Sequence, residues 1–125
     1  MKKFLAVIIV VLAALPLASS AQASTASHRE ALEAAKSYLR SGNFSKAGLI
    51  EQLESPYGED FSHSDARWAV AHVHANWYAE AVEAAKSYLR SGHFSRQSLI
   101  EQLESPYGEN FTHAQAVYGV SKAYR

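Results

Sequence analysis

The sequence predicts an all-α protein built from two tandem three-helix repeats of the helix-turn-helix-like kind. The first observation is a duplication. Residues 33–42 return unchanged as residues 83–92, and residues 49–59 return unchanged as residues 99–109. Self-similarity at a fixed period is typical of one supersecondary unit used twice. The second observation is that apolar residues recur at steps of three and four through both copies, which is the spacing of one helix face.

Start and stop signals divide the first repeat into three helices. Gly42 is expected to end the first helix by adopting a left-handed conformation. Ser45 caps the second helix, and Pro56 ends it by disfavouring the helical conformation at the preceding residue. Ser62 and Asp65 form a capping-box variant at the start of the third helix, and Thr and Gln replace them in the second repeat. The predicted helices of the whole chain span residues 28–41, 45–54, 64–90, 95–104 and 113–124.

The third predicted helix is long and is shared by both repeats. No Gly or Pro interrupts residues 59–91, and the apolar residues keep a helical phase through this stretch. We therefore expect one continuous helix over residues 64–90, about 40 Å long at 1.5 Å per residue. Asn76 is its weakest point, because asparagine is a mediocre helix former. The alternative is a short break from His74 to Asn76.

The N-terminal segment is predicted to be a secretory signal peptide. Lys2 and Lys3 precede an apolar run over residues 4–17, which is shorter than the roughly 20 residues that a membrane span needs. Ala21 and Ala23 then give the small-x-small pattern of a cleavage site. The alternative is an uncleaved N-terminal anchor. The predicted division of the chain is a signal peptide over residues 1–23, a first repeat over residues 28–75 and a second repeat over residues 76–125.

Charge and cysteine content exclude several functions. The chain carries twelve basic and twelve acidic side chains, and removal of Lys2 and Lys3 leaves ten basic ones. Affinity for nucleic acids comes mainly from Lys and Arg that neutralise phosphates, so no nucleic-acid partner is expected. The sequence has no cysteine. A thiolate nucleophile, a thiolate zinc site and a lipid-modified cysteine are therefore excluded.

The duplicated pattern resembles a known family. Each repeat reads Ala-x3-Tyr-Leu-x4-Phe-Ser-x3-Leu-Ile-x-Gln-Leu-x-Ser-x-Tyr-Gly-Glu-x-Phe, and the likeness runs over residues 34–70 and again over residues 84–120. This pattern is similar to that of the Ltp-like, host cell surface-exposed lipoproteins of Gram-positive bacteria and their phages. The resemblance implies a tandem of small three-helix units, in agreement with the helices expected from periodicity.

The same resemblance implies a function. The best-known role in the family is superinfection exclusion, in which a protein outside the host membrane blocks DNA injection through contact with the phage tape measure protein. The protein is then expected to be secreted, or held at the extracytoplasmic face of a Gram-positive membrane through its N-terminal segment. The missing lipobox cysteine departs from the family pattern. The alternative function is a cell-wall-associated or secreted structural module with no role against phages.

The candidate partner-binding residues are carboxylates and tyrosines that recur in both repeats. A tyrosine in an exposed Pro-Tyr-Gly turn can anchor an interface, and the alternative is a tyrosine packed over its own turn. Acidic residues around the second helix would suit a basic or amide-rich partner, and the alternative is the solvated face of an amphipathic helix. The predicted set is Glu51, Glu54, Tyr57, Glu59, Asp60, Glu101, Glu104, Tyr107 and Glu109.

No catalytic, cofactor or metal residues are predicted. Glu51 and Glu54 are neighbours on a helix face, and carboxylate pairs can serve glycoside hydrolysis. A helical unit this small, however, gives no sign of a substrate cleft. His72 and His74 are two residues apart and would point to different sides of a helix. We therefore expect a binding protein and not an enzyme, with an oligomeric state that the sequence does not define.

Overall fold

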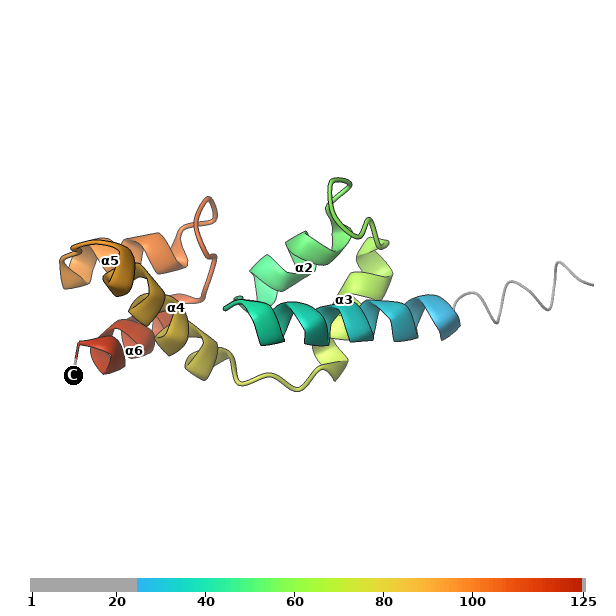
Figure 1. Cartoon of the computed structure of the whole chain (residues 1–125), viewed down its shortest axis with the longest axis horizontal. Helices are drawn as coiled ribbons and strands as arrows, with labels where there is room; N and C mark the ends of the chain where they lie inside the picture. The colour runs from blue at the N-terminus through green and yellow to red at the C-terminus, as the bar shows by residue number, and fades with distance from the viewer. Residues whose placement is uncertain (1–24, 125) are drawn as a thin grey trace, which may run out of the picture.

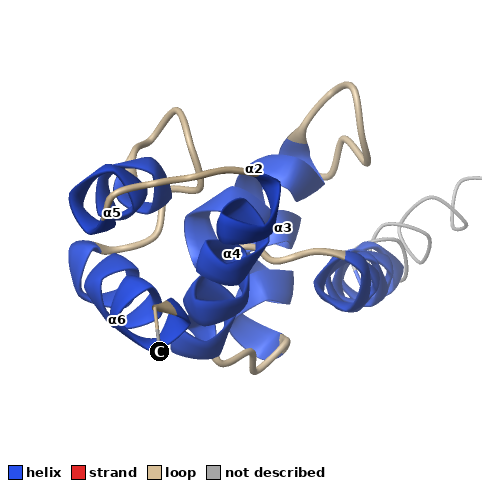
Figure 2. Cartoon of the chain, turned by 60° about the vertical axis from the view of Figure 1, so that its left-hand side comes forward, coloured by secondary structure: helices blue, strands red, loops and turns tan. Residues whose placement is uncertain are grey.

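The computed structural model describes residues 25–124, and within that span the chain forms helices and no strand (Figures 1 and 2). The first helix extends to residue 41 and is already formed at residue 25, the first described. It is followed by α2 (Lys46–Glu54), α3 (His63–His72), α4 (Trp77–Ser91), α5 (Arg96–Glu104) and α6 (His113–Ala123). The all-α class is confirmed. The predicted signal peptide and its cleavage residues Ala21 and Ala23 lie outside the described residues.

The expected long shared helix over residues 64–90 is wrong, and the break given as the alternative is present. Helix α3 ends at His72, and α4 begins at Trp77. Between them His74 adopts a left-handed φ of 54°. The side-chain oxygen of Asn76 accepts a hydrogen bond of 3.1 Å from the N–H three residues later, and so caps α4. Asparagine side chains compete with the helical backbone for hydrogen bonds, and here this local cap prevails over uninterrupted apolar spacing.

Gly42 ends the first helix in a different way from the one expected. Among the described glycines none has a positive φ. A Cβ at Gly42 would lie 3.1 Å from the ring of Phe44, so the glycine makes room for a closely packed aromatic side chain. The left-handed conformations are adopted instead by Asp60, His74 and Asn110.

The predicted N-caps are present, but the two capping boxes differ. Thr112 accepts from the N–H of Gln115, whose side chain accepts from the N–H of Thr112, so the box before α6 is complete. Before α3, Ser62 accepts from the N–H of Asp65. The Asp65 carboxylate turns away toward the first helix, where it accepts a hydrogen bond from Ser27. The first repeat therefore keeps half of the box and uses the remaining carboxylate for tertiary packing.

Each repeat has its own small core. In both, two leucines of the second helix pack against alanines and a valine of the flanking helices. The first core contains Ala31, Ala35, Leu49, Leu53, Ala66, Ala69 and Val70. The second contains Ala81, Ala84, Ala85, Leu99, Leu103, Phe111, Ala116 and Val120. Burial of these side chains is the main force that holds each three-helix unit together.

Candidate functional site

The turn after α2 is held tightly by its own backbone. The N–H groups of Gly58 and Asp60 both donate to the carbonyl of Ser55, at 3.0 and 2.9 Å. The N–H of Tyr57 donates to Ser55 Oγ at 3.2 Å. With the backbone fixed in this way, the Tyr57 side chain projects outward and is 99% exposed. The alternative of a tyrosine packed over its own turn is therefore wrong.

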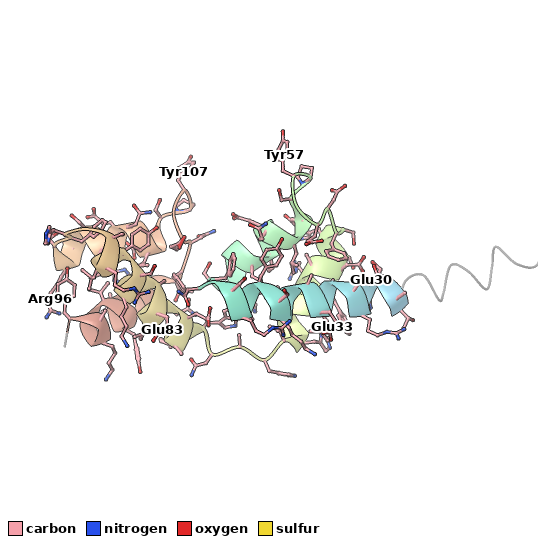
Figure 3. All side chains as sticks on the ribbon, viewed as in Figure 1. Glu30, Glu33, Tyr57, Glu83, Arg96 and Tyr107 are labelled. Atoms are coloured by element: carbon pink, nitrogen blue, oxygen red, sulfur yellow. The ribbon has the colours of Figure 1, made fainter. Side chains whose placement is uncertain are left out.

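The second repeat builds the same turn with the same bonds. Gly108 and Asn110 donate to the carbonyl of Ser105, and Tyr107 is again 99% exposed. A Cβ at Gly108 would lie only 2.3 Å from the carbonyl oxygen of Gln102, so glycine is required for the turn to fold back on its helix. Both tyrosines stand at turn tips on the same side of the molecule (Figure 3).

A matching pair of contacts supports each turn from behind. Gln52 donates to the Tyr38 hydroxyl at 3.3 Å, and Gln102 donates to the Tyr88 hydroxyl at the same distance. Burial raises the pKa of Tyr88, and the nearby Glu109 carboxylate raises it further. These links join the first helix of each repeat to the helix before the turn, so the tyrosine tips are displayed on a fixed framework.

Two of the predicted carboxylates are paired with histidines at the base of the turns. Glu54 Oε2 lies 2.6 Å from His63 Nδ1, and Glu104 Oε2 lies 2.5 Å from His113 Nδ1. Both histidines open a third helix. The carboxylates are half-buried, whereas the imidazoles are exposed. The repeated pair ties the end of one helix to the start of the next.

The remaining predicted carboxylates do not form one surface. Glu59 and Asp60 are exposed on the turn of the first repeat, where Glu59 accepts from the Tyr38 hydroxyl. Glu101 accepts from Gln97 on its own helix. Glu51 instead faces the second repeat, where its carboxylate accepts from Asn110 at 3.4 Å. The repeated sequence thus places equivalent residues in different surroundings.

The junction between the two repeats contains hydrogen bonds that the sequence analysis did not predict. The buried Ser45 caps α2 and also donates from its hydroxyl to the carbonyl of Glu109. The N–H of Phe44 donates to Glu80 Oε1 at 3.0 Å. Burial raises the pKa of Glu109 and of Glu80. A signal was present in the sequence, because Ala47 and Gly48 at this place become Gln and Ser in the second repeat.

A ring stack on the first repeat was also missed. Trp68 lies between His28 and His72, with ring centroids 4.5 and 4.0 Å away. Asp65 accepts from Ser27 Oγ at 2.5 Å and lies 3.2 Å from His28 Nε2. The Ser27 hydrogen bond lowers the pKa of Asp65 against the opposing effect of burial, with smaller contributions from Ser62 and His28. The equivalent positions of the second repeat hold Tyr78, Tyr118 and Lys122. There the two tyrosine rings meet edge to face with centroids 5.3 Å apart, and the Lys122 ammonium lies 5.4 Å from the centroid of the Tyr118 ring.

Residues 25–124 contain neither a candidate metal site nor a candidate membrane span. No group of three His, Asp or Glu side chains in this span is arranged to hold a metal ion. None of the helices in the same span is both long enough and apolar enough to cross a bilayer.

The fold and the paired turns define a class of protein: a small tandem-repeat helical module that displays the same side chains twice. The family model for the host cell surface-exposed lipoprotein, Ltp, matches residues 27–73 and again residues 76–122. The chain therefore belongs to the Ltp family.

One solved structure supports the same assignment. The chain is similar to Ltp, a superinfection exclusion protein from the Streptococcus thermophilus temperate phage TP-J34, with 29% sequence identity and a TM-score of 0.69. The match covers 76% of this chain and 93% of the other. Comparison with curated proteins gives no match.

Proposed function

We propose that this protein excludes superinfecting phages by binding, outside the cell membrane, a phage protein that is delivered during DNA injection. Membership of the Ltp family and the likeness to a phage superinfection exclusion protein support this function. Binding without catalysis is the simplest activity for two small helical units that share their exposed residues.

The observation that carries the proposal is the pair of fully exposed tyrosines. Tyr57 and Tyr107 are each 99% exposed on turns fixed by backbone hydrogen bonds. Tyrosine offers a large, amphipathic contact area and loses little conformational freedom on binding. A rigid pair on one side of the molecule can engage two points of one partner, which raises affinity above that of either contact alone.

The charges beside the tyrosines favour a partner with basic or amide-rich segments. Glu54, Glu59 and Asp60 surround the first turn, and Glu104 lies at the base of the second. Family resemblance implies the phage tape measure protein as this partner. Complementary charge would speed the encounter and favour that partner over others.

If the protein stays at the cell surface, it needs a membrane attachment other than a lipidated cysteine, because the sequence contains no cysteine. We propose that the N-terminal apolar segment supplies it, either as an uncleaved anchor or as an export signal for a protein that then stays near the membrane. Sequencing the N-terminus of the exported product distinguishes these two possibilities.

Phage DNA entry tests the proposal directly. Sensitive bacteria expressing the full chain are exposed to a panel of phages, and adsorbed particles and intracellular phage genomes are counted separately. We expect normal adsorption and a large loss of DNA entry for at least one phage. The double variant Tyr57→Ala, Tyr107→Ala should restore entry, and each single variant should restore it partly.

The matched control is Tyr78→Ala, which removes an exposed tyrosine outside the two turns. It should leave exclusion unchanged. Normal DNA entry by every phage in the presence of the unaltered chain would overturn the proposed function. Exclusion that survives the double tyrosine variant would reject the turns as the binding site.

A further inference from the structure

The junction between the repeats is polar and separate from both cores. It rests on hydrogen bonds from Ser45 to Glu109, from Phe44 to Glu80 and from Asn110 to Glu51. Neither hydrophobic cluster extends across it, apart from Trp77, which begins α4 and packs against the first core. Open hollows of about 450 and 430 Å³ flank the junction. The repeats can therefore separate without opening either core.

The loop that allows the repeats to meet is held in an unfavourable conformation. His74 has a left-handed φ of 54°, which costs free energy for any residue with a Cβ. Residues 63–91 contain no Gly or Pro, and their apolar positions keep helical spacing across the loop. In the structure an extended loop connects α3 to α4 (Figure 1). The alternative conformation available to this segment is a continuous helix from α3 into α4.

Straightening the loop separates the two sides of the junction within one chain. A continuous helix over residues 63–91 would be about 43 Å long, with the repeats at opposite ends. The face of the first repeat, formed by Ser45, Gly48 and Glu51, would then have no partner in its own chain. The Glu109–Asn110 segment of the second repeat would be equally free.

We propose that two copies of this chain exchange repeats, so that the first repeat of each pairs with the second repeat of the other through the same junction. Such an exchange re-forms the junction hydrogen bonds of the closed monomer between two chains and relieves the left-handed residue in the loop. Short, strained connections of this kind are known to favour domain swapping. The exchange is independent of the proposed function in phage exclusion.

Differences between the repeats determine which face pairs with which turn. At the positions of Ala47 and Gly48 the second repeat has Gln97 and Ser98, and at the position of Asn110 the first repeat has Asp60. A Cβ at Gly48 would lie 3.4 Å from the Glu109 carbonyl, so serine at this position would crowd an approaching turn. Each chain therefore has one receptive face and one matching turn, and two chains satisfy both.

The absence of cysteine from the sequence allows a clean cross-linking experiment. The full chain is co-expressed in two forms, one with Glu51→Cys and one with Asn110→Cys, and treated on intact cells with a short bis-maleimide. These side chains meet across the junction, so a cross-linked dimer forms only when the junction joins two chains. A chain with both substitutions reports the intramolecular pairing.

The repeats themselves supply the matched control. Asp60→Cys and Glu101→Cys are the equivalent substitutions on the turn and face that the junction does not use. Co-expression of these two forms should give no dimer above the level of random collisions. An equally strong dimer in the control would overturn the proposal.

Variants of the loop should move the dimer fraction in opposite directions. His74→Gly removes the steric cost of the left-handed conformation and should lower the dimer fraction by about fivefold. Asn76→Ala, combined with His74→Ala, removes the α4 cap and favours the continuous helix, so the fraction should rise by about fivefold or more. Exchange is supported if both shifts occur, and it is rejected if the Asn76→Ala, His74→Ala form gives no dimer.

Discussion

The two repeats share most of their sequence, yet the same part of each has a different environment. In the first repeat the start of α2 packs under the second repeat, and Ser45 is only 1% exposed. In the second repeat the equivalent Ser95 is exposed and serves α5 only as a cap. The turns show the reverse pattern, because Glu109 and Asn110 are half-buried while Glu59 and Asp60 are exposed.

This difference shows how a duplicated unit acquires a defined arrangement. Residues that fold each unit are kept in both copies, including the leucines of the second helix and the Ser-Pro-Tyr-Gly turn. Residues at the junction differ between the copies, and the small Ala47 and Gly48 occur only where a neighbour approaches. If the two repeats were identical, each could bind the turn of the other equally well, and the junction would have no defined orientation.

The largest predicted effect concerns the packing of the third helix in each repeat. A Cβ at Gly119 would lie 2.7 Å from backbone atoms of Ala81 on α4, so the two helices cross too closely for alanine. We expect Gly119→Ala to lower the free energy of unfolding by about 1–3 kcal/mol, as overpacking does. Urea denaturation followed by circular dichroism measures this change.

The mirror substitution in the first repeat should behave differently. Ala69 occupies the equivalent position and is buried, so Ala69→Gly loses helix propensity and a packed methyl group, at a cost of about 1–2 kcal/mol. Helix propensity alone predicts the opposite sign for Gly119→Ala, because glycine inside a helix costs about 1 kcal/mol relative to alanine. A stabilised Gly119→Ala protein would show that this expectation is correct and that the close crossing is not needed.

The second prediction exchanges junction residues between the repeats. Gly48→Ser installs the residue of the second repeat, and its Cβ would lie 2.9 Å from Ser45 Oγ and 3.4 Å from the Glu109 carbonyl. We expect a loss of about 1–2 kcal/mol, because the junction must shift and one or two hydrogen bonds weaken. Thermal unfolding and the protection of the Ser45 region in hydrogen exchange measure it.

The control is Ser98→Gly, which makes the opposite exchange on the exposed face. Ser98→Gly should lower the free energy of unfolding by only about 0.5 kcal/mol, because glycine has a lower helix propensity than serine. Equal losses for the two variants would mean that the junction does not discriminate between the repeats.

The sequence predicted the elements well because the signals for them are local. Ser45, Pro56 and Thr112 each act on their own helix end, and each end lies within a residue or two of the expected place. The loop at His74 was given only as an alternative, because the apolar spacing continues through it. The Asn76 cap and the contacts between the two repeats favour the break. Contacts between the repeats join residues far apart in the sequence, so no local sequence pattern predicts them.

The candidate site shows the same limit. Exposure of Tyr57 and Tyr107 was one of the two alternatives that the turn motif left open, and the structure selects it. The division of the acidic residues was not expected, since the residues that follow Glu51 and Glu101 are identical in both repeats. The two glutamates differ in the residue one turn earlier, Ala47 or Gln97, and in what packs against them. The sequence signal for the junction was the change of Ala47 and Gly48 to Gln97 and Ser98. The meaning of this change is clear only when the fold is known.

The smallest predicted effect is the pH dependence of the junction. Burial raises the pKa of Glu109, so the folded state binds this proton more tightly than the unfolded chain. The contribution of Glu109 to the free energy of unfolding therefore increases as the pH falls from the raised folded pKa toward the ordinary value of 4.5. At neutral pH the carboxylate is charged, and its burial lowers stability by the full amount.

Glu109→Gln should remove that cost, with a gain at pH 7 of less than about 1 kcal/mol because the carboxyl is only half-buried. The variant should also have a flatter dependence of melting temperature on pH than the unaltered chain. Glu59→Gln, at the equivalent exposed position, should leave both quantities unchanged. A Glu109→Gln protein that is less stable than its parent at pH 7 would mean that the charge itself helps to hold the repeats together.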